Sequence, residues 1–270
     1  MAVVPKEDVE SNGDLNDVMS GSGPFKFKDR MPGSRLRLEK NTDYYKEGRP
    51  YVNEMEVVIL SDETARTAAL RTGDVDMIDN VPFKDVASLK ADALINVLGG
   101  PSLNYTSWLV NVKKEPFTDV KVRQAMAWGI NRQEIVDKGF DGLGRPLAGT
   151  ALIPPYWAGS TKDIYNTDYN KAKQLLADAG FPNGFKMELL TTPEAFYQIP
   201  ISEVSQAEWR KIGIDAEIVV KDIGTALDEW VAGNYDVFAI RWWGADFVDP
   251  DGGLTPQLSC GGSFNFTFYC

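Results

Sequence analysis

Through most of the chain, the spacing of hydrophobic residues switches between the period of a helix and the period of a strand. Residues 61–73 predict a short helix that Ser61 caps and Gly73 ends. Elements of both types follow one another closely, which is typical of an α/β protein. In chain order, the next predicted elements are a strand at 75–78, a helix at 85–92, strands at 94–98 and 103–112, and a helix at 119–130.

A second helix–strand alternation follows a long Gly- and Pro-rich stretch at 139–166. Asn131, with Glu134 three residues later, predicts a capped helix start just before that stretch. The amphipathic helices and short strands imply a sheet with helices on its faces, where ligands bind beyond the carboxyl ends of strands. The predicted helices cover 168–180, 201–213 and 225–233, and the predicted strands cover 185–192, 214–220 and 235–243.

Charge and length exclude several classes of function. The chain has 270 residues, a formal net charge of −11 and a pI near 4.6, so a nucleic-acid partner is not expected. No apolar run approaches the roughly 20 residues of a membrane-spanning helix. The first residues lack the basic-then-apolar layout of a signal peptide, so we expect any export signal to be absent from this sequence.

Histidine is absent, which removes the commonest general base and the commonest zinc ligand. No other metal or cofactor motif occurs, so we expect neither. Cys260 and Cys270 are the only cysteines. A local disulfide in an oxidising compartment and two unpaired thiols are both compatible with their spacing.

The segment RWWGADFVDP, residues 241–250, ends the last predicted strand and is open to two interpretations. In the first, Trp242 or Trp243 forms a flat apolar wall, and Asp246 presents a carboxylate to a cationic or hydroxylated ligand. In the second, both indoles belong to the core and the aspartates serve a turn.

Seven segments in order resemble one protein family, the extracellular solute-binding proteins of ABC importers of the oligopeptide/dipeptide-binding class. The resemblance implies an α/β fold of the periplasmic binding protein type II-like kind, with two lobes that close over a solute. No reaction is catalysed in such a receptor. The segments are GSGPFKF, residues 35–60, ETARTAALRTGDVDMID, residues 109–136, PLAGTALIPP, NTDYNKAKQLLADAGF and YDVFAIRWWGADFVDP.

The resemblance also assigns lobes and roles. Residues 1–104 belong to the lobe that bears the termini, and residues 105–270 belong to the second lobe, both incomplete. Asp246 matches the position that pairs with the ligand's α-amino group in peptide-binding members, and Trp243 matches the neighbouring aromatic wall. The resemblance implies a periplasmic or extracellular location, with a lipid anchor on the parent protein as an alternative, and an ABC permease as the partner.

Two departures from the family pattern bear on the ligand. Dipeptide-binding members place an arginine for the ligand carboxylate in the segment that reads TTPEAFYQIP here, which contains no basic residue. A free dipeptide is therefore not the favoured ligand. The chain is also shorter than family members, so we expect exposed sheet edges that favour self-association.

The expected ligand is a peptide, amino-acid derivative, sugar or opine-like solute. Two alternatives remain open: an interaction module without a ligand, and a glycosidase that uses Asp246 and Asp249 as its carboxylate pair. The predicted ligand contacts are Asp246, Trp243, Trp242, Tyr105, Trp108 and Asn111.

Overall fold

A computed structural model describes residues 6–12, 21–100, 104–147, 165–193, 195, 197–242 and 255–270. The chain divides into two compact units, Met1–Val81 and Pro82–Cys270. This division falls earlier than the lobe boundary predicted after residue 104, which remains a prediction about the complete receptor. Each unit is described separately below.

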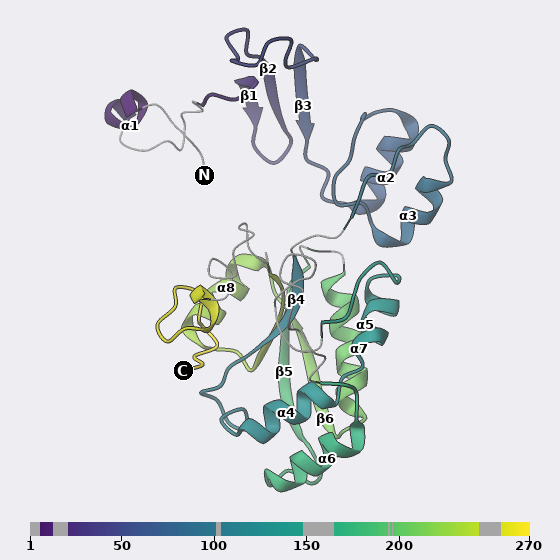
Figure 1. The fold of residues 1–270 in the computed structure, drawn as a ribbon, viewed down its shortest axis with the longest axis vertical. Coiled ribbons are helices and arrows are strands. Elements are labelled where there is room, and N and C mark those ends of the chain that lie inside the picture. The colour runs from purple at the N-terminus through teal and green to yellow at the C-terminus, as the bar shows by residue number, and fades with distance from the viewer. Residues whose placement is uncertain are drawn as a thin grey trace. The chain divides into compact units, whose positions relative to one another are not determined.

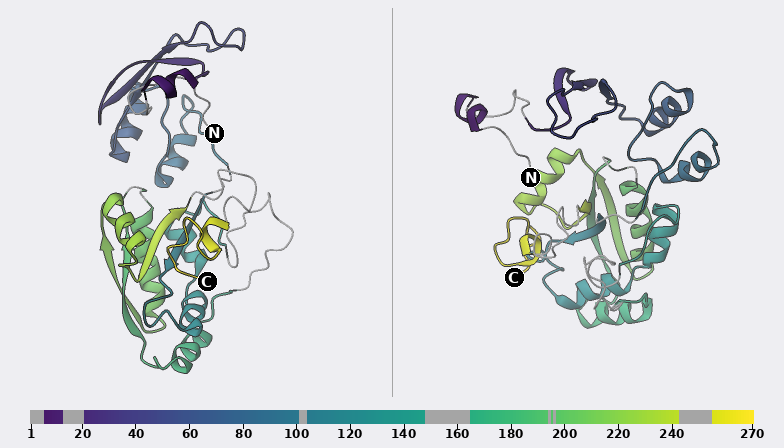
Figure 2. Two further views of the ribbon diagram at one scale, coloured as in Figure 1. Left: turned by 90° about the vertical axis from the view of Figure 1, so that its left-hand side faces the viewer. Right: turned by 45° about the horizontal axis from the view of Figure 1, so that its top comes forward.

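The first unit contains an antiparallel three-stranded sheet with strand order β1-β2-β3. The residues GSGP, at 21–24, lead directly into β1, and positive φ at Gly33 (69°) permits the tight turn from β1 to β2. Figure 2 shows the three strands as one twisted layer. The elements of this unit are α1 (Lys6–Asn12), β1 (Phe25–Met31), β2 (Arg35–Lys40), β3 (Glu54–Val58) and α2 (Glu63–Thr72).

Helix α2 confirms the helix predicted at 61–73 but corrects its cap. The Asp62 carboxylate, rather than Ser61, accepts a 2.7 Å hydrogen bond from the backbone N–H of Ala65. Gly73 ends the helix in the left-handed conformation, as predicted. Asp62 fits this position well because a carboxylate also interacts favourably with the positive end of the helix dipole.

The strands predicted at 75–78 and 94–98 are wrong. Both segments are described, and neither forms a strand. Met77 is 81% exposed and Leu94 is 96% exposed, so these apolar side chains lie against no sheet or core. Short apolar runs become strands only when a neighbouring strand supplies hydrogen-bond partners, and local sequence does not reveal that neighbour.

The second unit is built on a four-stranded mixed sheet with strand order β4-β7-β5-β6. Strands β5, β6 and β7 run parallel, and β4 pairs antiparallel with β7. The predicted strands at 103–112, 185–192, 214–220 and 235–243 are confirmed with small shifts at their ends. They are β4 (Tyr105–Val110), β5 (Phe185–Thr191), β6 (Ile214–Val220) and β7 (Val237–Trp242).

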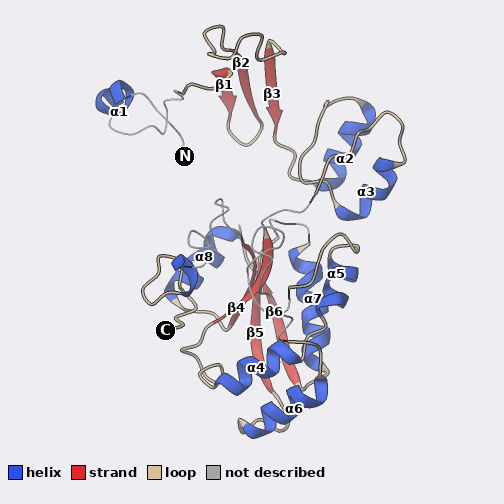
Figure 3. Ribbon diagram, in the orientation of Figure 1, coloured by secondary structure: helices blue, strands red, loops and turns tan. Residues whose placement is uncertain are grey.

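Helices cover both faces of this sheet (Figure 1). Helix α8 lies on one side of the strands, whereas α4 to α7 lie on the other, as the helices in Figure 3 show. This layering confirms the predicted α/β class. The helices of the second unit are α3 (Phe83–Lys90), α4 (Val120–Trp128), α5 (Arg132–Gly139), α6 (Tyr169–Asp178), α7 (Gln198–Arg210) and α8 (Ile223–Ala232).

The turn between α4 and α5 shows how a local cap is completed from a distance. The Asn131 side chain accepts hydrogen bonds from the N–H groups of Gln133 (3.0 Å) and Glu134 (3.3 Å), as predicted. The Glu134 carboxylate pairs with Lys138. In a capping box the Glu134 side chain would accept the backbone N–H of Asn131. Here that N–H donates to the carboxylate of Glu208 on α7, at 3.0 Å.

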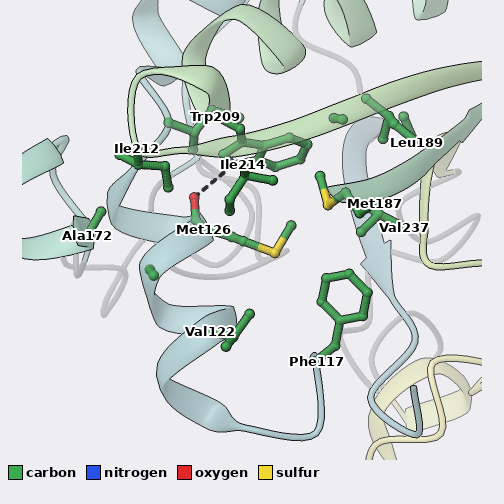
Figure 4. Packing of buried hydrophobic residues seen from close by; sticks show 14 of the residues in the cluster. Phe117, Val122, Met126, Ala172, Met187, Leu189, Trp209, Ile212, Ile214 and Val237 are labelled. Atoms are coloured by element: carbon green, nitrogen blue, oxygen red, sulfur yellow. Dashed lines mark hydrogen bonds between the residues drawn. The ribbon is translucent and has the colours of Figure 1, made fainter. Parts of the chain in front are cut away.

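The larger hydrophobic core lies between the sheet and helices α4, α6 and α7 (Figure 4). Trp209 of α7 is 2% exposed, and its indole N–H donates a 3.1 Å hydrogen bond to the carbonyl of Met126 on α4. Burial of aromatic and aliphatic side chains on this face supplies most of the stability of the unit. Met187, Leu189, Ile214 and Val237 form the sheet's side of this core.

A smaller core on the opposite face joins α8 to the C-terminal segment 255–270. Trp230 of α8 meets Phe266 edge to face, with ring centroids 4.7 Å apart. The Tyr235 hydroxyl donates a 2.7 Å hydrogen bond to the Phe266 carbonyl. Cys260 and Cys270 form a disulfide, so the structure has the first of the two states that their spacing left open.

Candidate functional site

The candidate site lies where the strands of the second unit end. Because β5, β6 and β7 are parallel, their last residues, Thr191, Val220 and Trp242, meet at one edge of the sheet. Antiparallel β4 brings its first residue, Tyr105, to the same edge, where it pairs with Trp242. We call this edge, defined by these four residues, the carboxyl edge. It is the position at which open α/β sheets bind ligands.

The strand order places Trp242, the residue that precedes the sequence WGAD (residues 243–246), at the carboxyl edge. Strand β7 lies inside the sheet, between β4 and β5, and its backbone delivers Trp242 to the rim. Trp243, Asp246 and Asp249 lie outside the described residues. Their roles therefore stay predictions.

Tyr105, a second predicted contact, also lies directly at this edge. Its hydroxyl donates a 2.8 Å hydrogen bond to the side-chain carbonyl of Gln257 in the C-terminal segment. Burial raises the pKa of the Tyr105 hydroxyl above its ordinary value. Gln257 was not predicted, because its separation in sequence from Tyr105 gives no local signal.

Trp108 lies on the opposite face of the sheet from Tyr105. Residues three apart on a strand point to opposite sides, and Trp108 packs against the larger core. Its ring meets Trp209 edge to face, with centroids 5.9 Å apart. The Trp108 indole nitrogen is buried, and among the described residues it has no hydrogen-bond partner. The predicted contacts Tyr105 and Trp108 are thus separated by the sheet.

Asn111 has a structural role at the other end of β4. It is 1% exposed, and its amide nitrogen donates to the carbonyls of Gly233 (2.9 Å) and Tyr235 (3.1 Å). Its amide oxygen accepts a 3.1 Å hydrogen bond from the backbone N–H of Lys113. These bonds tie β4 to the turn before β7. We therefore do not retain Asn111 among the proposed ligand contacts.

Sequence reasoning missed a second pair of residues at the carboxyl edge, Arg241 and Tyr197. Arg241 is the penultimate residue of β7 and is partly exposed. Its positive charge acts on the hydroxyl of Tyr197, the residue that precedes α7. Burial raises the pKa of the Tyr197 hydroxyl, and the charge and hydrogen bond of Arg241 oppose that rise.

Gln198 fixes the connection between β5 and α7 at this edge. Its side-chain carbonyl accepts hydrogen bonds from the Thr192 hydroxyl (3.1 Å) and the Ala195 N–H (3.2 Å). Its amide nitrogen donates to the carbonyl of Ala239 on β7, at 3.5 Å. Both Thr192 and Gln198 are buried. The start of α7, including Tyr197, is thereby anchored to β5 and β7.

No cation site appears in the part of the chain that the structure describes. No group of three or more His, Cys, Asp or Glu side chains is arranged there to hold a metal ion. A cavity of about 310 Å³ opens at the opposite, amino end of β5 and β6, and it has mixed charges. Lys114 and Asp236 form an ion pair across part of it, at 2.5 Å.

None of the helices described is long and apolar enough to cross a membrane.

Solved structures place the fold among the periplasmic binding proteins. One is AgaA from A. tumefaciens R10 in complex with agropinic acid, with a TM-score of 0.80 and 34% identity over 96% of this chain and 52% of that one. Another is the ABC transporter-associated protein DppA from Helicobacter pylori in complex with the peptide STSA. It has a TM-score of 0.83 and 27% identity over 99% of this chain and 54% of that one.

Residues 1–265 match the family of bacterial extracellular solute-binding proteins, family 5 (middle), and the chain belongs to this family. The dipeptide-binding protein of Escherichia coli K12 is 32% identical over 95% of this chain and 49% of its own length. Heme-binding protein A of Haemophilus influenzae is 32% identical over 88% of this chain and 44% of its own length. The chain therefore spans about half the length of these relatives.

The family and the fold class predicted from the sequence are confirmed. These relatives are binding proteins, in agreement with the prediction that the chain is not an enzyme. The family is extracellular, in agreement with the predicted compartment. A disulfide between Cys260 and Cys270 suits that compartment, because thiols are kept reduced in the cytosol.

Proposed function

We propose that the chain forms part of a receptor that captures a small solute between two lobes and passes it to an ABC permease for import. The observation that carries this proposal is the topology of the four-stranded sheet. In a chain of this family, β7 delivers Trp242 to the carboxyl edge, immediately before the WGAD sequence. The receptor acts outside the cytoplasm, in the periplasm or held to a membrane by a lipid anchor.

The proposed contacts divide into a charged group and an apolar surface. Asp246 pairs with a cationic or hydroxylated group of the solute, and Trp242 and Trp243 supply the flat wall. Tyr105 supports this site from β4, where it pairs with Trp242 in the sheet. Trp108 is retained as a proposed contact on the opposite face of the sheet, which α7 covers. Aromatic area with a few oriented polar groups is the usual composition of a small-molecule site.

The class of ligand is a peptide, an amino-acid derivative, a sugar or an opine-like compound. Relatives bound to agropinic acid and to a tetrapeptide support a solute with both polar and apolar parts. Thermal-shift screening of these four classes, followed by calorimetry of the hits, tests the proposal. We expect one class to bind and to raise the melting temperature.

Two matched variants assign the binding to the proposed site. Asp246→Asn should weaken binding by about 10- to 100-fold, because the neutral amide loses a charge-assisted hydrogen bond. Asp215→Asn makes the same change at the exposed amino end of β6 and should leave affinity unchanged. Absence of binding in every class, or equal weakening by the two variants, would overturn the proposal.

A further inference from the structure

The C-terminal segment, residues 255–270, reaches the carboxyl edge through Gln257. This residue lies in a helical turn at 255–258, and its side-chain carbonyl accepts the 2.8 Å hydrogen bond from the Tyr105 hydroxyl. Both side chains are partly buried. Because Tyr105 pairs with Trp242 at the edge of the sheet, Gln257 sets the direction of a hydroxyl that belongs to the proposed site.

The far end of the C-terminal segment is fixed to the second unit, beyond its contacts with α8. The Thr267 carbonyl accepts a 3.1 Å hydrogen bond from the backbone N–H of Val112, just after β4. The Phe268 ring lies so close to Gly233 that a Cβ there would come within 3.0 Å of it, and the Lys113 ammonium lies 4.5 Å from the ring centroid. Phe268 has a φ of 62°, a strained backbone conformation that such surrounding contacts maintain.

Two connections join this fixed end to the turn that carries Gln257. The disulfide between Cys260 and Cys270 begins three residues after Gln257. The side-chain nitrogen of Asn265 donates a 2.9 Å hydrogen bond to the carbonyl of Ser259, between Gln257 and the first cysteine. The position of the turn therefore depends on the part of the segment that is anchored to the sheet.

The loop between the cysteines also packs directly on that turn. The backbone N–H of Phe264 donates a 2.9 Å hydrogen bond to the carbonyl of Pro256. A Cβ at Gly262 would come within 2.3 Å of the same carbonyl, so the close approach requires glycine. Gln257 is thus held by a compact, cross-linked loop.

The hydrogen bond to Gln257 decides what Tyr105 offers to a solute. A phenol has one proton to donate and two lone pairs that accept. The Gln257 carbonyl takes the proton, so the Tyr105 oxygen faces an approaching group as an acceptor. Hydroxyl and ammonium groups donate to such an oxygen, whereas a carbonyl group of a solute does not.

We infer that Gln257 is a positioning residue, which orients Tyr105 as a hydrogen-bond acceptor for a hydroxyl or ammonium group of the solute. The disulfide-closed C-terminal segment holds Gln257 in place for this role. The inference rests on the proposed function and deepens it. A side chain that is oriented before binding lowers the entropy that the solute must offset, which favours affinity.

The test removes the hydrogen bond and keeps the length of the side chain. Calorimetry measures binding of Ser-Thr-Ser-Ala, ornithine, agropinic acid and maltose, and each probe that binds is measured again with the variants. Gln257→Met offers no carbonyl and should weaken binding by about 3- to 10-fold. Gln257→Glu, whose carboxylate accepts the same proton, should stay within about twofold of the wild type. Gln257→Lys donates to the hydroxyl instead and should weaken binding at least as much as Gln257→Met.

A double-mutant cycle shows whether Gln257 acts through Tyr105. Tyr105→Phe removes the acceptor and should weaken binding by about 3- to 10-fold. Addition of Gln257→Met to Tyr105→Phe should then cause no further loss, because the hydroxyl to be oriented is gone. Gln174→Met makes the same change on the exposed side of α6 and should keep the wild-type affinity.

The role of the C-terminal segment is tested with the double variant Cys260→Ser, Cys270→Ser. It should weaken binding by a factor similar to that of Gln257→Met, and the two changes together should weaken it by less than the product of the separate factors. Far-UV circular dichroism of each variant reports on folding. Wild-type affinity without the disulfide would overturn the role of the segment.

The remaining outcomes separate the inference from the proposed function. Wild-type affinity of Gln257→Met or Gln257→Lys would overturn the positioning role and leave solute capture standing. Equal weakening by Gln257→Met and Gln257→Glu, or a full further loss when Gln257→Met is added to Tyr105→Phe, would do the same. Failure of all four probes to bind would overturn solute capture itself, and the positioning role with it.

Discussion

The carboxylate of Glu208 on α7 accepts a 3.0 Å hydrogen bond from the backbone N–H of Asn131, at the turn between α4 and α5. It also accepts a 2.6 Å hydrogen bond from the Tyr169 hydroxyl on α6 and pairs with Lys211 at 2.5 Å. The Glu208 side chain is 4% exposed. One buried charge thus joins three helices that cover the sheet.

Replacement of Glu208 should destabilise the protein markedly. Glu208→Ala leaves the Asn131 N–H and the Tyr169 hydroxyl without their acceptor in a buried setting, and we expect a loss of about 2–4 kcal/mol in the free energy of unfolding. Urea denaturation followed by tryptophan fluorescence measures it. Glu203→Ala, on the exposed side of the same helix, should cost less than about 0.5 kcal/mol. Similar losses in both variants would contradict this role.

The same contacts predict a dependence of stability on pH. Burial acts to raise the pKa of Glu208, but hydrogen bonds from Lys211, Tyr169 and the Asn131 N–H outweigh it and hold the pKa below its ordinary value. A lowered pKa in the folded state means that the stabilisation is present above the unfolded-state pKa, about 4.3. It is lost as pH falls from that value through the lower folded-state pKa.

The measurement is the difference in unfolding free energy between the wild type and Glu208→Gln, which cannot ionise. We expect a positive difference from pH 7 down to about 5 that shrinks at lower pH. Subtraction cancels the titration of carboxyl groups elsewhere, including Asp29, whose pKa the hydrogen bond from Arg37 lowers despite the opposing effect of burial. A difference that stays constant down to pH 3 would count against a lowered pKa.

The Glu208 network also shows what sequence can and cannot predict. Asn131 was identified as a cap because a cap bonds to residues two and three positions away. Its other partner, Glu208, lies on a different helix and left no trace in the local pattern. The Arg241–Tyr197 contact was missed for the same reason, and the strands predicted at 75–78 and 94–98 failed because pairing depends on distant segments.

The candidate site could be proposed from sequence only where a family pattern carries it. The WGAD residues and Tyr105 were singled out through the resemblance and through the position of strands, and the strand order places Trp242 and Tyr105 side by side. Asn111 is a candidate from sequence because a polar residue at a strand end can serve a ligand or the fold. Its three hydrogen bonds to the chain's own backbone become visible only in three dimensions.

Tyr235 should make the free energy of unfolding decrease at alkaline pH. Burial raises the pKa of its hydroxyl, which donates to the Phe266 carbonyl at 2.7 Å. A raised pKa means that the stabilisation is complete below the unfolded-state pKa, about 10, and declines as pH rises above it. Tyr235→Phe should cost about 1 kcal/mol at pH 7 and weaken the alkaline decline. Tyr269→Phe, at an exposed ring, is the control and should change neither.

The disulfide should stabilise the C-terminal segment that carries Gln257 and Phe266. The two cysteines are 10 residues apart, and closing a loop of this length restricts the unfolded chain. This restriction should add about 2–3 kcal/mol to the free energy of unfolding. The double variant Cys260→Ser, Cys270→Ser should lose that amount in urea denaturation. Thiol titration of the denatured, unreduced protein should find no free thiol, and two thiols per chain would exclude the bond.

Self-association through an exposed strand is the last prediction. In the three-stranded sheet, β3 lies at an edge, and Val57 and Val58 are each 43% exposed. Edge strands with apolar side chains pair readily with other chains, and lysine blocks such pairing. Light scattering at high concentration should give a mass above the monomer for the wild type and nearer the monomer for Val57→Lys. Val231→Lys places the same charge on the exposed side of α8 and should behave as the wild type, whereas a strictly monomeric wild type would refute the prediction.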